Sequence, residues 1–143
     1  MLVQLKNIKK SFGKQEVLQE IDLELCEGSI CGLLGPSGCG KTTLVNIIVG
    51  MSRANSGEAV VLDEKPPFAK VKRQIGFMPQ SEALYLDLTA EQNLRFFGAL
   101  YGLSGNEMDT EIPHVLSIVR LEDTKRKLVA DFSGGMKRRL SLA

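Results

Sequence analysis

One octapeptide constrains the fold of this chain more than any other feature. It contains three glycines and ends in Lys-Thr, and it reads Gly35-Pro36-Ser37-Gly38-Cys39-Gly40-Lys41-Thr42. The apolar run at residues 29–34 precedes it and is typical of a strand buried on both faces. Residues 41–49 follow with apolar side chains at helical spacing, and Gly50 stands where a helix C-cap is expected. The segment therefore predicts a strand, a glycine loop and a helix, in that order.

The octapeptide matches the P-loop pattern G-x-x-x-x-G-K-[ST]. Its glycines let successive backbone N–H groups point at one phosphate, and the following helix adds the positive end of its dipole. Lys41 can reach the β- and γ-phosphates of ATP, the Thr42 hydroxyl can ligate Mg²⁺, and the Thr43 hydroxyl can contact phosphate. The alternative is a glycine-rich turn that binds nothing, but the flanking strand and helix favour a nucleotide site. Kinases, GTPases, helicases and transporters all share this loop.

Charge and cysteine content narrow the class of protein. The chain has 18 basic and 17 acidic residues, so no nucleic-acid partner is expected. Three cysteines without a C-x-x-C pair indicate reduced thiols rather than a disulfide framework or a zinc site. No apolar stretch approaches the roughly 20 residues of a transmembrane helix. We expect a cytoplasmic protein, for which any passage across a membrane is made by another chain.

The first half of the chain reads as strands. Residues 21–25 alternate between apolar and polar side chains, and residues 57–63 and 75–78 form short apolar runs. Together with the P-loop unit, these runs predict an α/β core.

From residue 89 the apolar spacing becomes helical. Thr89 with Gln92 and Ser104 with Glu107 match capping boxes at two helix starts. Residues 115, 118 and 119 share one face of the second helix, and Pro113 predicts a kink or a helix that restarts near residue 110. The helical block divides from the core near residue 87.

A second glycine motif lies near the end of the chain and reads Phe132-Ser133-Gly134-Gly135-Met136-Lys137-Arg138-Arg139-Leu140. It resembles the signature motif of ATP-binding cassette ATPases, usually written L-S-G-G-Q; Phe132 and Met136 depart from the commonest letters. Gln80, in Met78-Pro79-Gln80, stands where this family has its Q-loop glutamine. Phe12, followed by Gly13, stands where the family has an aromatic that stacks on adenine. Plain strand packing of Phe12 and an ordinary polar strand end at Gln80 are the alternatives.

The resemblance implies a fold and a mechanism. The fold is a P-loop NTPase (RecA-like) core with an N-terminal antiparallel β-subdomain, in residues 1–87, and an α-helical subdomain, in residues 88–143. Two nucleotide-binding domains associate head to tail, and ATP lies between the P-loop of one and Ser133, Gly134 and Gly135 of the other. Lys41 and Gln80 act in catalysis, with Gln80 near Mg²⁺ and the attacking water. Residues 81–88 lie near the coupling helix of a transmembrane permease, which places the protein at the cytoplasmic face of the membrane.

The family pattern continues with a strand ending in Asp-Glu and then a switch histidine. Neither follows here, and His114, the only histidine, lies in the helical block and is interpreted as structural. We therefore expect a fragment that lacks the C-terminal part of the core. A general base is worth ~10²–10⁴ in rate, so hydrolysis by this chain alone is expected to be very slow.

Residues 88–103 look most like those of bacterial exporters. A nucleotide-binding module without turnover and a soluble non-transport member of the family are the alternatives.

Overall fold

The computed structural model describes residues 1–66, 68, 71, 74–80 and 83–143. The chain forms two compact units, Met1–Phe77 and Met78–Ala143, and each is considered by itself. The division near residue 87 that the sequence predicts concerns functional subdomains and stays a prediction.

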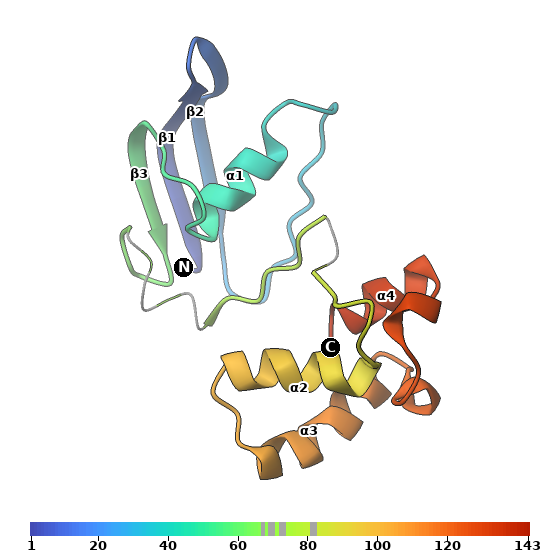
Figure 1. Cartoon of the computed structure of the whole chain (residues 1–143). Helices are drawn as coiled ribbons and strands as arrows, with labels where there is room; N and C mark the ends of the chain where they lie inside the picture. Colours follow the sequence, from blue (N-terminus) through green and yellow to red (C-terminus); the bar gives the residue numbers. More distant parts are fainter. Residues whose placement is uncertain (67, 69–70, 72–73, 81–82) are drawn as a thin grey trace. The chain divides into compact units, whose positions relative to one another are not determined.

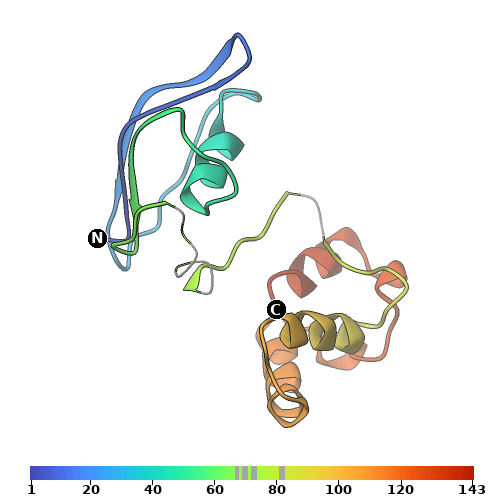
Figure 2. The same cartoon turned by 60° about the vertical axis from the view of Figure 1, so that its left-hand side comes forward.

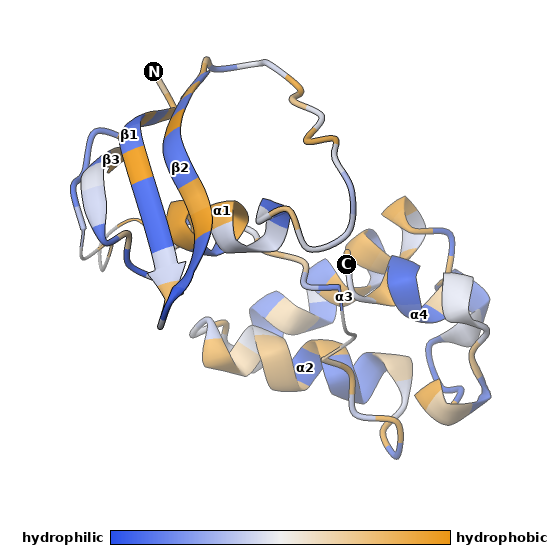
Figure 3. Cartoon of the chain, turned by 90° about the horizontal axis from the view of Figure 1, so that it is seen from above, coloured by the Kyte–Doolittle hydropathy of each residue, from blue (hydrophilic) through white to orange (hydrophobic). Residues whose placement is uncertain are grey.

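The first unit is built on an antiparallel sheet of three strands, β1 (Val3–Phe12), β2 (Gln15–Leu25) and β3 (Ser56–Val61), in the order β2-β1-β3 (Figure 1). Leu5 pairs with Leu23 of β2 on one side and with Ala59 of β3 on the other. Apolar and polar residues alternate along β1 and β2, as the coloured bands in Figure 3 show. The strands predicted around residues 21–25 and 57–63 are therefore confirmed, although β3 ends at Val61.

Helix α1 (Lys41–Ile48) completes the core of the first unit. Its buried residues Leu44 and Ile47 belong to the same apolar cluster as Leu5 and Ile8 of β1. Gly50 follows the helix with φ 74, and its N–H bonds to the Ile47 carbonyl at 3.2 Å. The predicted glycine at the C-terminal end of this helix is thus confirmed, because a residue with positive φ there favours glycine.

Two predicted strands do not form. Residues 29–34 and 75–78 have no regular secondary structure, and the side chains of Ile30 and Leu34 are almost fully exposed. An apolar run becomes a strand buried on both faces only beside neighbouring strands that accept its backbone hydrogen bonds. The described sheet consists of β2, β1 and β3, and residues 29–34 pair with none of these strands. The prediction of a strand at residues 29–34 is therefore wrong for this structure, because apolar composition does not reveal pairing.

The second unit contains three α-helices, α2 (Ala90–Leu100), α3 (Gly105–Ile118) and α4 (Gly134–Leu140), with short 3₁₀ turns at Glu122–Thr124 and Val129–Asp131. Figure 2 shows the three helices from a second direction. Their apolar side chains gather in one core that includes Ile112, Leu116, Val129 and Leu140.

Both predicted capping boxes are present. The Thr89 and Ser104 hydroxyls accept hydrogen bonds from Gln92 N and Glu107 N, and the side chains of these partners accept bonds from the cap N–H groups. The bond from Ser104 N to the Glu107 carboxylate is 2.7 Å long. The hydrogen bond from the Ser104 backbone lowers the pKa of Glu107 below its ordinary value, and the hydrogen bond with the Ser104 side chain is the second, smaller cause. The caps satisfy N–H groups that a helix start otherwise leaves unpaired.

Helix α3 runs through Pro113 without the restart predicted near residue 110. The buried residues on this side are Ile112, Leu116 and Val119, and Val115 is half-buried. Ile118 is 64% exposed, so the predicted face is wrong at Ile118. A proline inside a helix costs ~3 kcal/mol. Burial of Ile112 and Leu116, each worth about 1.5–3 kcal/mol, and the capping box at the start can offset that cost.

A buried asparagine joins α2 to the segment before it. The Asn93 side chain is 0% exposed, and its Oδ1 accepts a bond from Tyr85 N at 2.8 Å. Its Nδ2 donates to the carbonyl oxygens of Tyr85, at 2.9 Å, and Thr89, at 3.0 Å. The side chain thus substitutes for a strand partner at Tyr85.

In the part of the chain that the structure describes, no helix is long and apolar enough to cross a membrane.

Asn93→Ala is expected to lower the free energy of unfolding of the second unit by about 1–3 kcal/mol, because it leaves the Tyr85 N–H without its partner and removes one of the two hydrogen bonds to the Tyr85 carbonyl oxygen. Urea denaturation followed by circular dichroism measures the change. Asn106→Ala, an exposed position near the start of α3, is the matched control and should change the midpoint little. Equal midpoints for the two variants would contradict the role given to Asn93.

Candidate nucleotide-binding site

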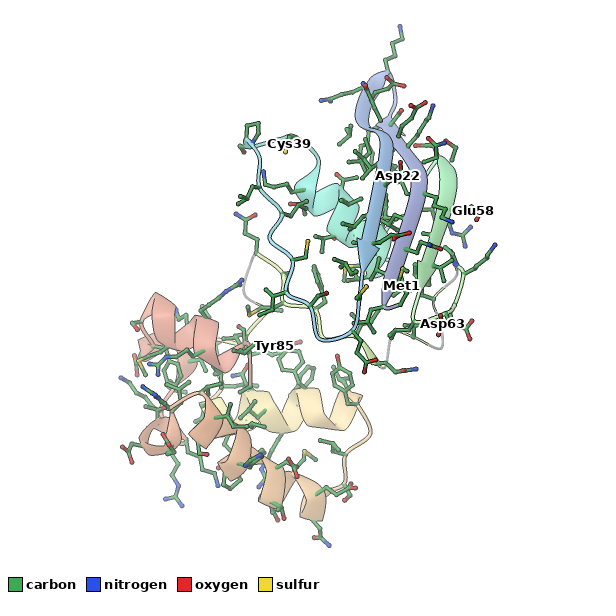
Figure 4. All side chains as sticks on the ribbon, turned by 180° about the vertical axis from the view of Figure 1, so that it is seen from behind. Met1, Asp22, Cys39, Glu58, Asp63 and Tyr85 are labelled. Carbon is green, nitrogen blue, oxygen red and sulfur yellow. The ribbon has the colours of Figure 1, made fainter. Side chains whose placement is uncertain are left out.

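The P-loop closes around the ammonium group of its own lysine. Lys41 Nζ lies 2.7 Å from the Gly35 carbonyl oxygen, 2.5 Å from that of Pro36 and 3.5 Å from Cys39 Sγ. Cys39 is exposed and lies just before the start of α1 (Figure 4). The carbonyl oxygens of the loop therefore hold the Lys41 ammonium group, and a phosphate oxygen can replace them as its hydrogen-bond acceptor.

Gly40 fixes where the loop ends and α1 begins. It has φ 96, and a Cβ added there would lie 2.7 Å from Leu18 Cδ2 and 2.9 Å from the Val17 carbonyl oxygen. Both neighbours belong to β2. Only glycine combines this backbone conformation with such a close approach to the strand. The last glycine of the motif is thus explained by packing against β2 as well as by the loop conformation.

The N-terminus of α1 lacks the side-chain cap that the other described α-helices have. Gly40 provides no capping hydrogen bond, and no acidic residue occurs in the first turn. By contrast, Thr89, Ser104 and Ser133 cap α2, α3 and α4. Because the first N–H groups of an α-helix have no partner within the helix, those of α1 are available to an anion, and the helix dipole favours one there.

The hydroxyls of the P-loop fit a nucleotide with Mg²⁺. Thr42 is exposed and Thr43 half-buried in the first turn of α1, directly after Lys41. Mg²⁺ binds oxygen ligands and keeps several waters, so one hydroxyl with phosphate oxygens is a suitable donor set. Lys41 would neutralise phosphate, and Thr42 would hold the ion.

Phe12 lies at the end of β1, where it pairs with Gln15 across the hairpin turn. Its side chain is 55% exposed, and Lys10 Nζ lies 5.0 Å from the centroid of its ring. Figures 1 and 2 both show the hairpin turn and the loop before α1 at the same end of the first unit. The exposed ring is thus available to stack on a base, and the structure does not use it as core packing.

The other predicted site residues belong to the second unit. Ser133 is the N-cap of α4, and its hydroxyl accepts a bond from Met136 N at 3.2 Å. Gly134 and Gly135 form the exposed first positions of that helix, as expected of a helix that begins at the signature motif. Gln80 is exposed near the start of the unit.

Two arginines of the signature helix have contacts that the sequence did not reveal. A basic triplet such as residues 137–139 is ordinarily a solvated helix face. Instead, Arg139 Nη1 donates to the carbonyl oxygens of Val119 and Arg120, at 3.0 and 3.1 Å. Arg138 Nη1 donates to the carbonyl oxygen of Pro79 at 2.8 Å. A run of cations carries no signal for such long-range contacts.

A glycine loop ordered around a lysine, followed by a helix with a free N-terminus, defines a P-loop nucleotide-binding domain. The ABC transporter family model matches residues 18–143, and the chain belongs to that family. ABC ATP-binding domains form a family of ATPases that bind ATP, usually with Mg²⁺.

Similar proteins come from bacteria. The linearmycin resistance ATP-binding protein LnrL of Bacillus subtilis (strain 168) is 39% identical over 99% of this chain and 46% of its own length. The Nod factor export ATP-binding protein I of Bradyrhizobium sp. (strain SNU001) is 36% identical over 100% of this chain and 47% of its own. The chain thus spans about half the length of the curated relatives it matches.

Solved structures show the same fold. An ATP-binding subunit of an ABC transporter superposes with a TM-score of 0.84 and 28% identity, over 99% of this chain and 60% of that one. The cbiO1 protein of Clostridium perfringens, part of the transporter complex cbiONQ, gives a TM-score of 0.88 at 20% identity, over 99% and 59%. The predicted class, a partial P-loop NTPase fold with an antiparallel sheet and helices, is confirmed.

Gly40→Ala is expected to lower the free energy of unfolding of the first unit by about 1–3 kcal/mol, from backbone strain at positive φ together with overlap with Leu18 and Val17. Gly76→Ala is the control, because a Cβ at Gly76 meets nothing within 4 Å and its φ is not positive. Urea denaturation compares the two. A Gly40→Ala variant as stable as Gly76→Ala would show that the loop does not depend on this close approach.

Proposed function

We propose that this chain is the nucleotide-binding part of the ATPase subunit of a membrane transporter, and that it binds Mg-ATP at its P-loop. The observation that carries this proposal is the free N-terminus of α1 behind the Lys41 ammonium group. Membership of the ABC transporter family supports the same conclusion.

Each predicted residue then has a role. The backbone of Gly35, Pro36, Ser37, Gly38, Cys39 and Gly40 surrounds the β-phosphate, and Lys41 reaches the β- and γ-phosphates. Thr42 ligates Mg²⁺, Thr43 contacts phosphate, and Phe12 stacks on adenine. Gln80 contacts Mg²⁺ and orients the attacking water. The exposure of Phe12, Thr42 and Gln80 supports these roles, since each side chain is accessible to a ligand.

A second nucleotide-binding domain completes the site in this proposal. Ser133, Gly134 and Gly135 of one chain face the γ-phosphate held by the P-loop of the other. The start of α4 supports this role, because Gly134 and Gly135 are exposed and a Cβ at either position meets nothing within 4 Å. A phosphate can therefore approach the backbone closely.

A transmembrane permease is the second proposed partner. It docks near residues 81–88, of which Ser81 and Glu82 lie outside the described residues. Tyr85 and Leu86 are 48% and 46% exposed, and the Tyr85 ring packs edge-on against Phe96 with 4.8 Å between ring centroids. Figure 4 shows Tyr85 beside α2. Exposed aromatic and aliphatic groups of this kind suit an interface. The protein would then lie at the cytoplasmic face of the membrane.

The direction of transport in this proposal is export. The names of the relatives, a linearmycin resistance protein and a Nod factor export protein, support it. Hydrolysis belongs to the assembled enzyme. Asp63 follows β3, but it precedes Gln80 in the chain, the reverse of the order that the family resemblance implies for a general base. These 143 residues alone are therefore proposed to turn over ATP very slowly.

Lys41→Ala should weaken Mg-ATP binding about 10- to 100-fold, because it removes hydrogen bonds from a charged group worth about 1.5–3 kcal/mol. Titration calorimetry on the chain and the variant measures the change. Lys127→Ala, an exposed lysine of the second unit, should bind like the unaltered chain. Equal affinities for all three proteins, or no binding by any, would contradict a working P-loop.

Ser133→Arg should leave ATP binding by the monomer nearly intact but prevent an ATP-dependent dimer, because the larger cation occupies the position of the partner's γ-phosphate. Sedimentation velocity with Mg-ATP measures the dimer. Ser133→Thr keeps the N-cap, and Ser117→Arg places the same charge on exposed α3; both should dimerise. Normal dimerisation of Ser133→Arg would remove Ser133 from the interface.

A further inference from the structure

Helix α4, which begins at the signature motif, is hydrogen-bonded to the backbone of Pro79, the residue before Gln80. Arg138 lies in the last turn of α4, and its Nη1 donates to the Pro79 carbonyl oxygen at 2.8 Å, across 59 positions of the chain. Both residues belong to the second unit. This contact therefore links two segments that the proposed function uses separately.

The orientation of the Pro79 carbonyl group directly determines the orientation of the backbone at Gln80. That carbonyl and the Gln80 N–H belong to one planar peptide group, so the direction of the oxygen fixes the direction in which Gln80 leaves the plane. Proline has its φ locked, and the residue before it, Met78, is restricted to extended conformations. Few torsions remain free in this segment, and the guanidinium group restrains the ψ angle of Pro79 that decides where Gln80 points.

Helix α4 is a firm support for this contact. Leu140 is buried in the core of the second unit at 2% exposure. Arg139 donates to two carbonyl oxygens at the end of α3, at 3.0 and 3.1 Å, and Ser133 caps the start of the helix. The helix is thus held by its core face, by one flank and at its N-terminus, and Arg138 extends from it toward Pro79.

We propose that Arg138 is a positioning residue that orients Gln80 and ties it to the helix that begins at Ser133. The proposal rests on the proposed function, in which Gln80 meets Mg²⁺. One short helix then sets both the phosphate-facing glycines and the direction of the Gln80 side chain. A planar guanidinium group suits this role because its donors have fixed directions.

The direct test is the amide resonance of Gln80 in the 143-residue chain, observed by ¹H–¹⁵N NMR. Arg138→Gln should shift this resonance, because the peptide group that Pro79 and Gln80 share loses the hydrogen bond at its carbonyl oxygen. Lys137→Gln removes the same charge from the neighbouring position and should leave the resonance unchanged. The urea midpoints of the two variants should agree, since the contact is exposed. A Gln80 amide that is unaltered in Arg138→Gln, or altered equally by Lys137→Gln, would overturn the proposal.

A double-mutant cycle tests the consequence for the ligand. The quantity is the ratio of ATP affinities measured with Mg²⁺ and with EDTA. Gln80→Ala and Arg138→Gln should each lower this ratio by at least about 2-fold. The double variant should lower it no further than Gln80→Ala alone; additive losses would mean that Arg138 does not act through Gln80. If the unaltered chain binds no ATP, the proposed function fails, and the Gln80 amide still decides the role of Arg138.

Discussion

The approach of Gly40 to β2 is the contact on which the candidate site depends. It places the start of α1 directly against Val17 and Leu18, so the helix cannot slide along the sheet without a collision. The buried residues Leu44 and Ile47 then enter the core that β1 and β3 share. The loop before Gly40 has to turn within a few residues, and its carbonyl groups converge on Lys41 as a result. We therefore attribute the geometry of the loop around Lys41 to the way in which α1 packs against the sheet.

Among the α-helices that the structure describes, side chains cap the starts of three, whereas the start of α1 has no side-chain cap. Side chains close α2, α3 and α4, where a cap is worth about 1 kcal/mol of stability. Helix α1 forgoes that stabilisation and leaves its N–H groups free. A ligand that supplies the missing acceptors would recover it and would raise the stability of the chain by mass action. The loss of local stability is thus located where a ligand is expected to bind, which is typical of functional sites.

Local signals in the sequence predicted local structure well. The two capping boxes, the helix that begins at Ser133 and the loop around Lys41 each depend on residues within a few positions of one another, and the structure has all of them. The expected strand at residues 29–34 failed because a strand also needs a partner from a distant part of the chain, which apolar composition does not reveal. The contact of Arg138 with Pro79 spans 59 positions, and a basic triplet gives no sign of which arginine reaches the backbone.

Phe132 and Met136, the two residues that depart from the commonest form of the signature motif, are explained by their packing. Phe132 is 5% exposed and belongs to the core of the second unit, and Met136 packs against that core. A phenylalanine at the first position therefore meets the same demand for an apolar anchor as the commoner leucine, with a larger buried surface. The exposed positions of the motif, Ser133 and the two glycines after it, keep the commonest letters. Both departures thus lie at residues that contact the core, and the positions to which the proposed function gives a role are unchanged.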